Sequence, residues 1–499
     1  MKIAGLFLVY LIPLLGHAAP VPQSDSLNLK SQQAKELMAQ GNFVQAISVY
    51  RELNQAVPNN PGLKLNLGMA LHMAGRKREA IPVLEEAIKL DPRLAPAWLF
   101  LGATRLQLGE TTAAVKPLKT VLGLEPDQQQ ARQMLAGALF SLGRTEEAAA
   151  EYRKLTNSNP ESAPVWYGLG RCYESLASSA FDELQKTAPE SAYVLALLAD
   201  IRLREQQRSS AFFLYRRALE QMPTMLGLHA ALAEIYRQTG HSEWAEIEKK
   251  KESQIPSPDC SDRKPECQFS RGRFDELTAA TKEARTAGFL YWRSRAYNEL
   301  ALNAFTRLGQ LPASAELHEL KARIFNNQKK YSEAASEWRE ALKLAPADSH
   351  VKKELAISLK FAQDYSAALS LFQELAREQP ESAELSYLLG DTLLAEQRAE
   401  EATPFLERAL RHDPKSVAAH KSLARAELAT GKASAAIPHL KLALPADDDG
   451  TLHYQLAQAY QASGQPELAR KTLADYQAIQ RSAAAQRESA ERETEITPP

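Results

Sequence analysis

Apolar residues recur along the chain with helical spacing, in stripes that come in pairs. In residues 95–126, Trp98 and Leu101 are about one turn apart and lie on one face of a predicted first helix. Ala114 and Leu118 have the same relation on a predicted second helix. The pattern is uniformly helical and predicts an all-α protein that is built from helical hairpins.

The hairpin pattern repeats at a fixed interval. Gly109 allows a tight turn between the two helices, and the proline at 126 ends the second helix because it lacks a backbone donor. One hairpin cannot bury its apolar face alone, whereas stacked copies bury a continuous core. We therefore expect a solenoid of about thirteen or fourteen hairpins. The prolines that lie 34 residues apart are Pro58, Pro92, Pro126 and Pro160, and then Pro346, Pro380 and Pro414.

Small residues occupy the places where the two helices approach each other. Gly102 on the first helix and Ala114 on the second let the helix axes come close together. The spacing W-x2-L-G, followed by a small residue, a large apolar residue and proline, resembles the tetratricopeptide repeat. The resemblance covers most of the chain. It implies an α-solenoid, a right-handed superhelix of stacked helical hairpins whose first helices line the concave face.

Two units break the regular interval. The unit that begins at Trp166 reaches Pro189 only 29 residues after Pro160, so its hairpin is expected to be short or its two helices to be partly fused. Its pattern over 173–184 recurs over 297–308, 124 residues later, which indicates a duplication. Inheritance from a copied segment explains the recurrence without a present role. The alternative is that both units bend the superhelix.

The first residues differ from the repeats. Lys2 precedes an apolar run, Ile3–Leu15, and small residues surround a cleavage point after Ala18. The run is shorter than the roughly 20 residues of a spanning helix, which argues against an uncleaved membrane anchor. No cysteine follows the cut to carry a lipid. We expect a cleaved signal peptide and a periplasmic or secreted protein with no integral membrane segment after cleavage.

The regular period fails in a proline-rich stretch that contains two of the three cysteines. Because the protein is expected to be exported, a disulfide between Cys260 and Cys267 is the leading interpretation, and two free thiols are the alternative. Cys172 lies on a repeat helix and is interpreted as a buried small apolar residue. The predicted segments are a signal peptide at 1–18, an N-terminal solenoid at 19–256, an irregular insertion with a degenerate repeat at 257–288, a C-terminal solenoid at 289–481, and a capping helix and tail at 482–499.

Charge and motifs exclude several classes of function. Lys and Arg number 60 against 61 Asp and Glu, so no global field favours nucleic acid. No serine lies in a nucleophile elbow, and His318 and Glu319 lack the second histidine of a metalloprotease helix. We therefore predict no catalytic residue, no metal site and no cofactor.

The remaining candidate for a functional surface is the inner wall of the solenoid. The family resemblance implies that set positions of each first helix point into the concave groove. These positions are apolar early in the chain, as suits an amphipathic helix or an extended apolar peptide, and aromatic and polar with a basic bias later. The alternative is that they pack against neighbouring first helices. The candidate groove residues are Leu65, Met69, Leu99, Leu106, Phe140 and Tyr167, and then Arg323, Lys353, Lys360, Phe361, Tyr387, Asp391, Arg425 and Tyr454.

Two functional hypotheses follow. The first is a non-enzymatic scaffold of the cell envelope or of secretion that binds protein or peptide partners in the groove. The alternative is an accessory protein of exported polysaccharide assembly that binds carbohydrate or its synthesis machinery, with Phe361, Tyr387 and Tyr454 as stacking surfaces. The carboxylate clamp with which related repeats hold chaperone C-termini is not expected, because Pro96 and Phe100 occupy two of its positions.

Overall fold

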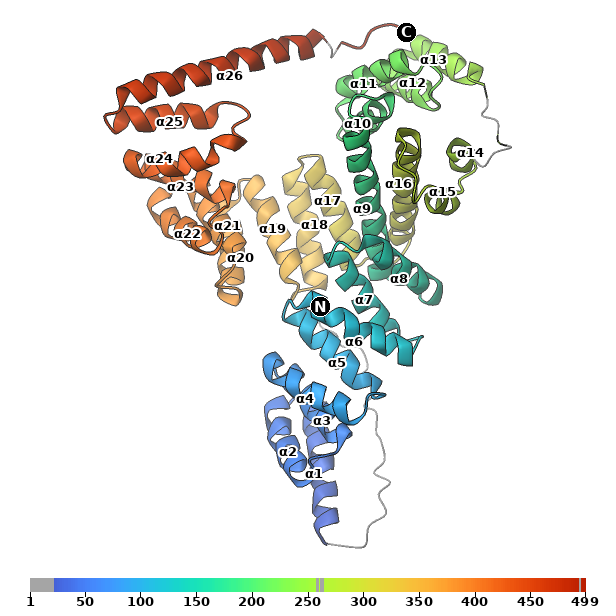
Figure 1. Cartoon of the computed structure of the whole chain (residues 1–499), viewed down its shortest axis with the longest axis vertical. Coiled ribbons are helices and arrows are strands. Elements are labelled where there is room, and N and C mark those ends of the chain that lie inside the picture. Colours follow the sequence, from blue (N-terminus) through green and yellow to red (C-terminus); the bar gives the residue numbers. More distant parts are fainter. Residues whose placement is uncertain (1–21, 257–259, 261–263, 493–494) are drawn as a thin grey trace.

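The computed structural model describes residues 22–256, 260, 264–492 and 495–499; the predicted signal peptide at 1–18 lies outside the described residues. Within these residues the regular structure is helical and contains no strand, so the all-α solenoid is confirmed (Figure 1). The helices of the described residues are α1 (Pro22–Ala39), α2 (Phe43–Ala56), α3 (Pro61–Met73), α4 (Lys77–Leu90), α5 (Ala95–Gln107), α6 (Thr111–Leu124), α7 (Gln129–Ser141), α8 (Thr145–Ser158), α9 (Ala163–Thr187), α10 (Ala192–Arg204), α11 (Arg208–Gln221), α12 (Leu228–Gln238), α13 (Ser242–Gln254), α14 (Pro265–Ser270), α15 (Phe274–Ala280), α16 (Ala287–Gly309), α17 (Ala315–Asn327), α18 (Tyr331–Leu344), α19 (Ser349–Phe361), α20 (Tyr365–Glu378), α21 (Ala383–Ala395), α22 (Ala399–His412), α23 (Val417–Ala429), α24 (Ala433–Ala443), the short 3-10 helix η1 (Leu444–Ala446), α25 (Thr451–Ala462) and α26 (Pro466–Arg492).

The pair α5 and α6 shows how one repeat is built. Gly109 takes the left-handed conformation, with a φ of 78°, and its amide donates to the carbonyl of Leu106 at 3.0 Å, which closes the turn. Gly102 on α5 lies under Leu118 on α6, and a Cβ atom added to Gly102 would be 2.8 Å from the Leu118 side chain. Leu118 is fully buried against Gly102, which has no side chain to displace it.

The same arrangement recurs in other repeats. A Cβ atom on Gly68 would lie 2.5 Å from Leu84, and one on Gly390 would lie 2.6 Å from Leu406. In each case the large residue follows the glycine by 16 positions. We call a glycine of a first helix that seats a large side chain of a second helix a glycine notch. The notches set how closely the two helices of a repeat approach.

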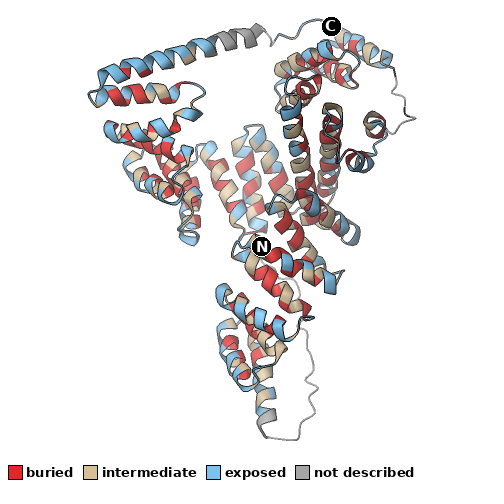
Figure 2. Ribbon diagram, viewed as in Figure 1, coloured by how far each residue is buried: buried red, intermediate tan, exposed pale blue. Residues whose placement is uncertain are grey.

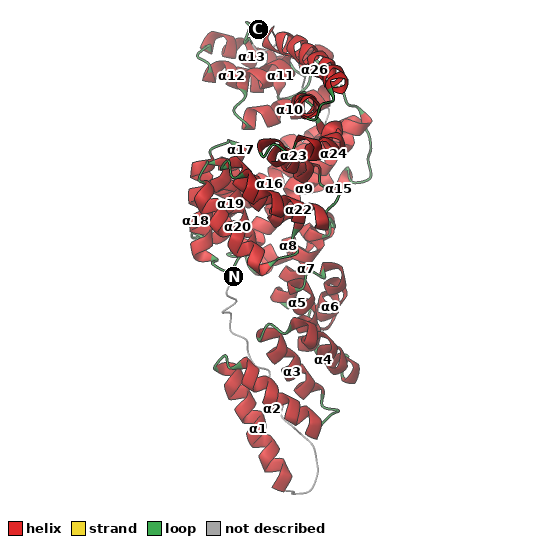
Figure 3. Cartoon of the chain, turned by 90° about the vertical axis from the view of Figure 1, so that its left-hand side faces the viewer, coloured by secondary structure: helices red, strands yellow, loops and turns green. Residues whose placement is uncertain are grey.

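The first helices of successive pairs form the inner side of the curve. Contacts between first helices join α3 to α5, α5 to α7, and α21 to α23. Helices of neighbouring repeats that contact each other directly lie on the concave side of the stack. The first helices are therefore on the concave side, and the second helices are on the convex side. Buried positions follow the seams between helices, and exposed positions lie along the edges (Figure 2). The view in Figure 3 shows the same stacking along the N-terminal arm.

The two irregular units of the sequence are two long single helices. In place of the two helices of a regular repeat, the first irregular unit has the single helix α9 of 25 residues. The second irregular unit has the single helix α16 of 23 residues. Of the two alternatives expected for the fifth unit, a short hairpin is not found, and the two helices are fused into one. The two long helices pack against each other more extensively than any other helix pair among the described residues, although 124 positions separate their matching residues.

Contacts along α9 and α16 show that the helices are antiparallel and related by an approximate twofold axis. The rings of the matching residues Tyr173 and Tyr297 stack on each other, with centroids 6.1 Å apart and planes 27° apart. A Cβ atom on Gly170 of α9 would lie 2.3 Å from Phe305 of α16. At the position that matches Gly170, Ser294 donates from its hydroxyl to a backbone carbonyl of α9 at 3.0 Å. The duplication thus forms an intramolecular interface of the self-complementary kind.

This pairing divides the molecule into three arms (Figure 1). Helices α1 to α8 form one arm that leads to the crossing of α9 and α16. Helices α10 to α13 leave the far end of α9 as a second arm, and α17 to α26 form the third. The first helices α10 and α17 each contact the long helix of the other copy, α16 and α9 respectively. The two sequence segments predicted as consecutive solenoids, 19–256 and 289–481, therefore share one central helix pair.

The irregular insertion forms a short hairpin, α14 and α15, that packs on α16. Cys260 and Cys267 form a disulfide, and Trp292 of α16 donates from its ring nitrogen to Glu266 at 3.0 Å. At the other end of the chain, α26 runs without a break across the boundary predicted at residue 481. The capping helix is therefore continuous with the last repeat.

The glycine notch predicts a contrast between two glycines of the same repeat. Gly102→Ala should lower the free energy of unfolding by about 1 to 3 kcal/mol, because the added methyl group collides with Leu118. Gly123→Ala, in α6, should be neutral or stabilise by about 0.5 kcal/mol, since no neighbour lies within 4 Å of its added Cβ atom. Denaturant unfolding of the two variants measures the difference. Equal effects would contradict the notch.

The central crossing predicts that a residue far along the chain stabilises the fifth unit. Phe305→Ala should destabilise the protein by about 2 to 4 kcal/mol, because it empties the space over Gly170. Phe361→Ala is the control, since its ring is 54 % exposed, and should cost less than about 1 kcal/mol. Hydrogen exchange should show increased opening in both α9 and α16 of the Phe305 variant. Exchange confined to α16 would contradict the pairing.

Candidate partner-binding groove

The early candidate residues are engaged in internal packing. Leu65 in α3 is 5 % exposed and belongs to the core of the first arm. Tyr167 in α9 is also buried; its hydroxyl donates to Glu319 of α17, and its ring lies 6.3 Å from Phe305. Leu65 and Tyr167 therefore pack internally, and binding by the apolar part of the groove stays a prediction. The other early residues, Met69, Leu99, Leu106 and Phe140, are partly buried and pack against the same cores.

Two of the late basic residues pair with carboxylates of neighbouring helices. Arg323 in α17 lies 2.9 Å from Glu174 in α9, beside a cavity of about 710 Å³ between α9, α10, α16 and α17. Lys353 in α19 lies 2.8 Å from Glu384 in α21. The predicted basic bias of the late wall is therefore partly neutralised within the wall itself.

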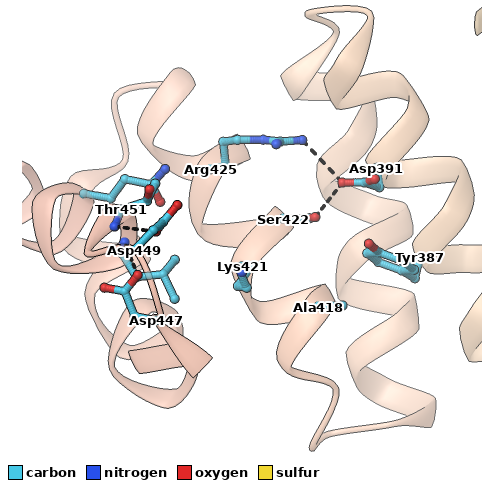
Figure 4. A pocket seen from close by; sticks show the side chains of 11 residues that line it. Tyr387, Asp391, Ala418, Lys421, Ser422, Arg425, Asp447, Asp449 and Thr451 are labelled. Atoms are coloured by element: carbon cyan, nitrogen blue, oxygen red, sulfur yellow. Dashed lines mark hydrogen bonds and ion pairs between the residues drawn. The ribbon is translucent and has the colours of Figure 1, made fainter. Parts of the chain in front are cut away.

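Two of the late candidate residues, Lys360 and Arg425, pair with a third, Asp391 in α21. Ser422 of α23 donates to one carboxylate oxygen at 2.7 Å, Arg425 lies 3.3 Å from the same oxygen, and Lys360 of α19 pairs with the other. Burial alone would raise the pKa of Asp391, but these partners outweigh burial and lower the pKa. The carboxylate thus stays charged and joins three successive first helices. Figure 4 shows Arg425 and Ser422 turned toward it.

A cavity of about 340 Å³ lies beside Asp391, between α21, α23 and α25. Tyr387, Lys421 and Gln455 line it from the three helices, and successive members of this set are 34 positions apart. The same place in the preceding repeat holds Lys353. One repeat position therefore projects a row of polar side chains along the inner face. We call this row, Lys353, Tyr387, Lys421 and Gln455, the inner ladder.

Acidic residues close the far side of this cavity (Figure 4). Asp447 accepts hydrogen bonds from the backbone amides of Leu452 and His453 at 3.1 and 2.9 Å, and Asp449 accepts one from Thr451 at 2.9 Å. The negative charges thus lie at the N-terminus of α25, which favours them. Together with the lysine and arginine of α23, they give the cavity charges of both signs.

Two predicted aromatic residues present exposed rings. Phe361 is 54 % exposed, and one of its faces stacks on Tyr331, with centroids 5.0 Å apart and planes 24° apart. Tyr454 is 45 % exposed and lies 5.4 Å from Tyr476 of α26. Tyr387 is partly buried beside Asp391, and burial and the carboxylate raise its pKa. The three rings lie in different repeats and do not form one continuous platform.

Sequence reasoning identified Tyr387, Asp391 and Arg425 but missed the other residues that line the cavity. Lys421 and Gln455 were detectable, because they repeat the position of Tyr387 at the 34-residue interval. The aspartates at 447 and 449 were not, because they lie in the irregular connection after α24, outside the repeat register.

Comparison with protein families gives matches in both the first and the third arm. The family described as tetratricopeptide repeat matches residues 37–103, 73–136, 105–172 and 393–453, and a second family of the same description matches residues 353–411. The chain is a tetratricopeptide repeat protein. Repeats of this family usually mediate protein–protein interaction.

Solved structures with similar helical repeats share low sequence identity with this tetratricopeptide repeat protein. MamA from Desulfovibrio magneticus RS-1, from residue 41 to its end, is 20 % identical, with 34 % of this chain and 96 % of that chain covered and a TM-score of 0.32. A tetratricopeptide repeat protein from Parabacteroides merdae ATCC 43184 is 15 % identical, with 67 % and 99 % covered and a TM-score of 0.33. No curated protein matches the chain.

The described part of this tetratricopeptide repeat protein shows no arrangement of three or more His, Cys, Asp or Glu side chains that could hold a metal ion. Within the same residues, no helix combines the length and the hydropathy that a bilayer-spanning segment needs.

Helix α23 also carries a buried carboxyl group that does not line the cavity. Glu427 is 8 % exposed, and one of its oxygens has no hydrogen-bond partner among the described residues. Burial, together with the charge of Glu407, raises the pKa of Glu427 to about 7, while Lys432 opposes the shift. His439 of α24 lies 4.0 Å away, and burial and the neighbouring His420 lower its pKa.

This environment predicts a pH-dependent stability of the third arm. Because folding raises the pKa of Glu427, ionisation of this carboxyl group destabilises the folded state. Its contribution to the free energy of unfolding is therefore fully present below about pH 4.5 and is lost as the pH rises through about 7. Glu427→Gln should therefore be more stable than the wild type at pH 8, by about 1 to 3 kcal/mol, and nearly equal to it at pH 4.5. Thermal unfolding at both pH values measures this. Glu400→Gln removes an exposed carboxylate of α22 and should show no such change.

Proposed function

We propose that this chain is a non-enzymatic scaffold of the cell envelope or of secretion, and that it binds segments of partner proteins along its inner face. The observation that carries the proposal is the inner ladder, three of whose members, Tyr387, Lys421 and Gln455, line one cavity from consecutive first helices. Internal ion pairs hold Asp391 and its partners in place, so the cavity wall is ordered before a partner binds.

The chemistry of the cavity favours an extended peptide segment over a helix. Tyr387, Lys421 and Gln455 offer a hydroxyl, an ammonium and an amide at a regular spacing, and the aspartates at 447 and 449 face them. Such a row matches a peptide that presents backbone polar groups and side chains of both charges. An apolar helix face would leave these groups unpaired on binding, which is costly.

Export is part of the proposal and rests on the N-terminal sequence. The apolar run Ile3–Leu15 with small residues before Ala18 has the form of a signal peptide. The disulfide of Cys260 and Cys267 is of the kind that persists in an oxidising compartment. N-terminal sequencing of the protein recovered from the periplasm should begin at Ala19. A mature protein that begins at Met1 would contradict the proposed export but would not contradict the proposed scaffold role.

The scaffold is tested with a charge reversal in the ladder and a matched reversal outside it. Lys421→Glu changes an exposed ladder residue, and Lys415→Glu changes an exposed lysine in the loop before α23. Partners captured from the envelope fraction by the wild type should be reduced at least fivefold with Lys421→Glu and unchanged with Lys415→Glu. Equal capture by both variants would contradict binding at the ladder.

An oligosaccharide titration distinguishes the scaffold from a carbohydrate-binding accessory protein. The scaffold predicts no saturable change in tyrosine fluorescence with cell-surface oligosaccharides. A saturable change that Phe361→Ala or Tyr454→Ala abolishes would favour the carbohydrate role, since these two rings are the exposed ones.

A further inference from the structure

The last five residues of the chain lie on a different arm from the helix that precedes them. Helix α26 belongs to the third arm and packs on α25. Residues Glu495–Pro499, which we call the tail, lie at α11 and α12 of the second arm (Figures 1 and 3). The tail therefore connects the ends of two arms that leave the central crossing separately.

Three contacts hold the tail on this surface. The hydroxyl of Tyr236 in α12 donates to the backbone carbonyl of Thr497 at 2.6 Å. The guanidinium of Arg216 in α11 donates to the carbonyl of Pro498 at 3.1 Å. The side chain of Ile496 is partly buried and packs against the hydrophobic core of the second arm. One apolar anchor and two carbonyl acceptors are thus recognised within three consecutive residues.

Aromatic side chains of the second arm hold the donors of this surface. With the tail in place Tyr236 is 0 % exposed, and its ring lies edge-on to Phe212 at 5.4 Å and to Trp244 at 5.5 Å. The Arg216 guanidinium lies 5.8 Å above the Phe212 ring. Burial raises the pKa of Tyr236, so the hydroxyl keeps its proton and donates. A buried tyrosine hydroxyl needs a hydrogen-bond partner, and here the tail supplies it.

The tail has the complementary chemistry. Pro498 and Pro499 have no amide hydrogen, and proline restricts the residue before it to extended conformations. The segment is therefore extended in advance and presents carbonyl acceptors to a surface of donors. A preorganised segment loses less conformational entropy when it binds.

We propose that the face of α11 and α12 formed by Phe212, Arg216 and Tyr236 is a peptide-recognition site for short extended Ile-Thr-Pro segments, and that the tail of the same chain is its resident ligand. The tail ties the third arm to the second, and a partner segment of the same chemistry binds by displacing it. This site is separate from the inner ladder, and its test does not depend on the scaffold proposal.

A photo-crosslinker at position 496 of the full chain tests the resident ligand directly. Irradiation of dilute protein should give a crosslink to peptides of α11 or α12 within one chain. Mixing with an isotope-labelled copy identifies the donor of each crosslinked peptide. Crosslinks only to other regions, or only between copies, would overturn the proposal that the tail binds in its own chain.

Peptide binding tests the recognition chemistry. The probe is a fluorescent peptide with the sequence of residues 492–499, and the variant Ile496→Asp vacates the site in the full chain. The probe should bind this variant at least tenfold more tightly than it binds the wild type, because the tethered tail competes at a high effective concentration. Equal binding to both proteins would overturn the proposal.

Two neighbouring arginines give a matched control. In the Ile496→Asp background, Arg216→Gln should weaken probe binding about fivefold to tenfold, because it removes the donor to the Pro498 carbonyl. Arg217→Gln also removes a cation above a phenylalanine ring, that of Phe213, and should change binding less than twofold. Equal losses for the two variants would show that the arginine acts through folding and would overturn its role in recognition.

Discussion

The close approach of two helices over a small residue of the first helix is the interaction on which this architecture depends. In α5 and α6, Leu118 is fully buried because Gly102 leaves room for it. Three regular repeats have such a glycine notch, and others have a buried alanine at the same position, such as Ala136 and Ala356. The stacking of pairs then buries a continuous core at no point larger than a few helices. This local rule explains how nearly five hundred residues fold without separate globular cores.

The central crossing obeys the same rule with a partner from elsewhere in the sequence. In a regular repeat the large residue lies 8 positions before the closing proline, and in the shortened unit of Gly170 that position holds Phe181. Because α9 is one unbroken helix, Phe181 cannot fold back over Gly170. Phe305, the matching residue of the duplicated unit, fills the notch instead. The duplication therefore has a structural role in the present molecule: each copy completes the other.

Features that depend on residues within one repeat could be predicted from the sequence, whereas contacts between distant segments could not. The helices, the turn at Gly109 and the fusion in α9 follow from spacing, because each depends on residues within one repeat. The pairing of α9 with α16 did not follow, since the period assigns every second helix to the first helix before it. In the groove, Asp391 was identified from its register, whereas its ion pairs, which neutralise much of the basic bias, depend on three-dimensional contacts between repeats.

The crossing of α9 and α16 also affects how the protein is made. During synthesis the first arm can stack pair by pair as it emerges, but the notch at Gly170 stays empty until Phe305 has been added 135 residues later. The second arm, α10 to α13, is complete before that contact closes. An ordinary solenoid can add repeats in order, each independent of distant ones. Here the third arm can stack on the central helix pair only after α16 has packed against α9. The three arms therefore assemble around this junction and not in order from one end.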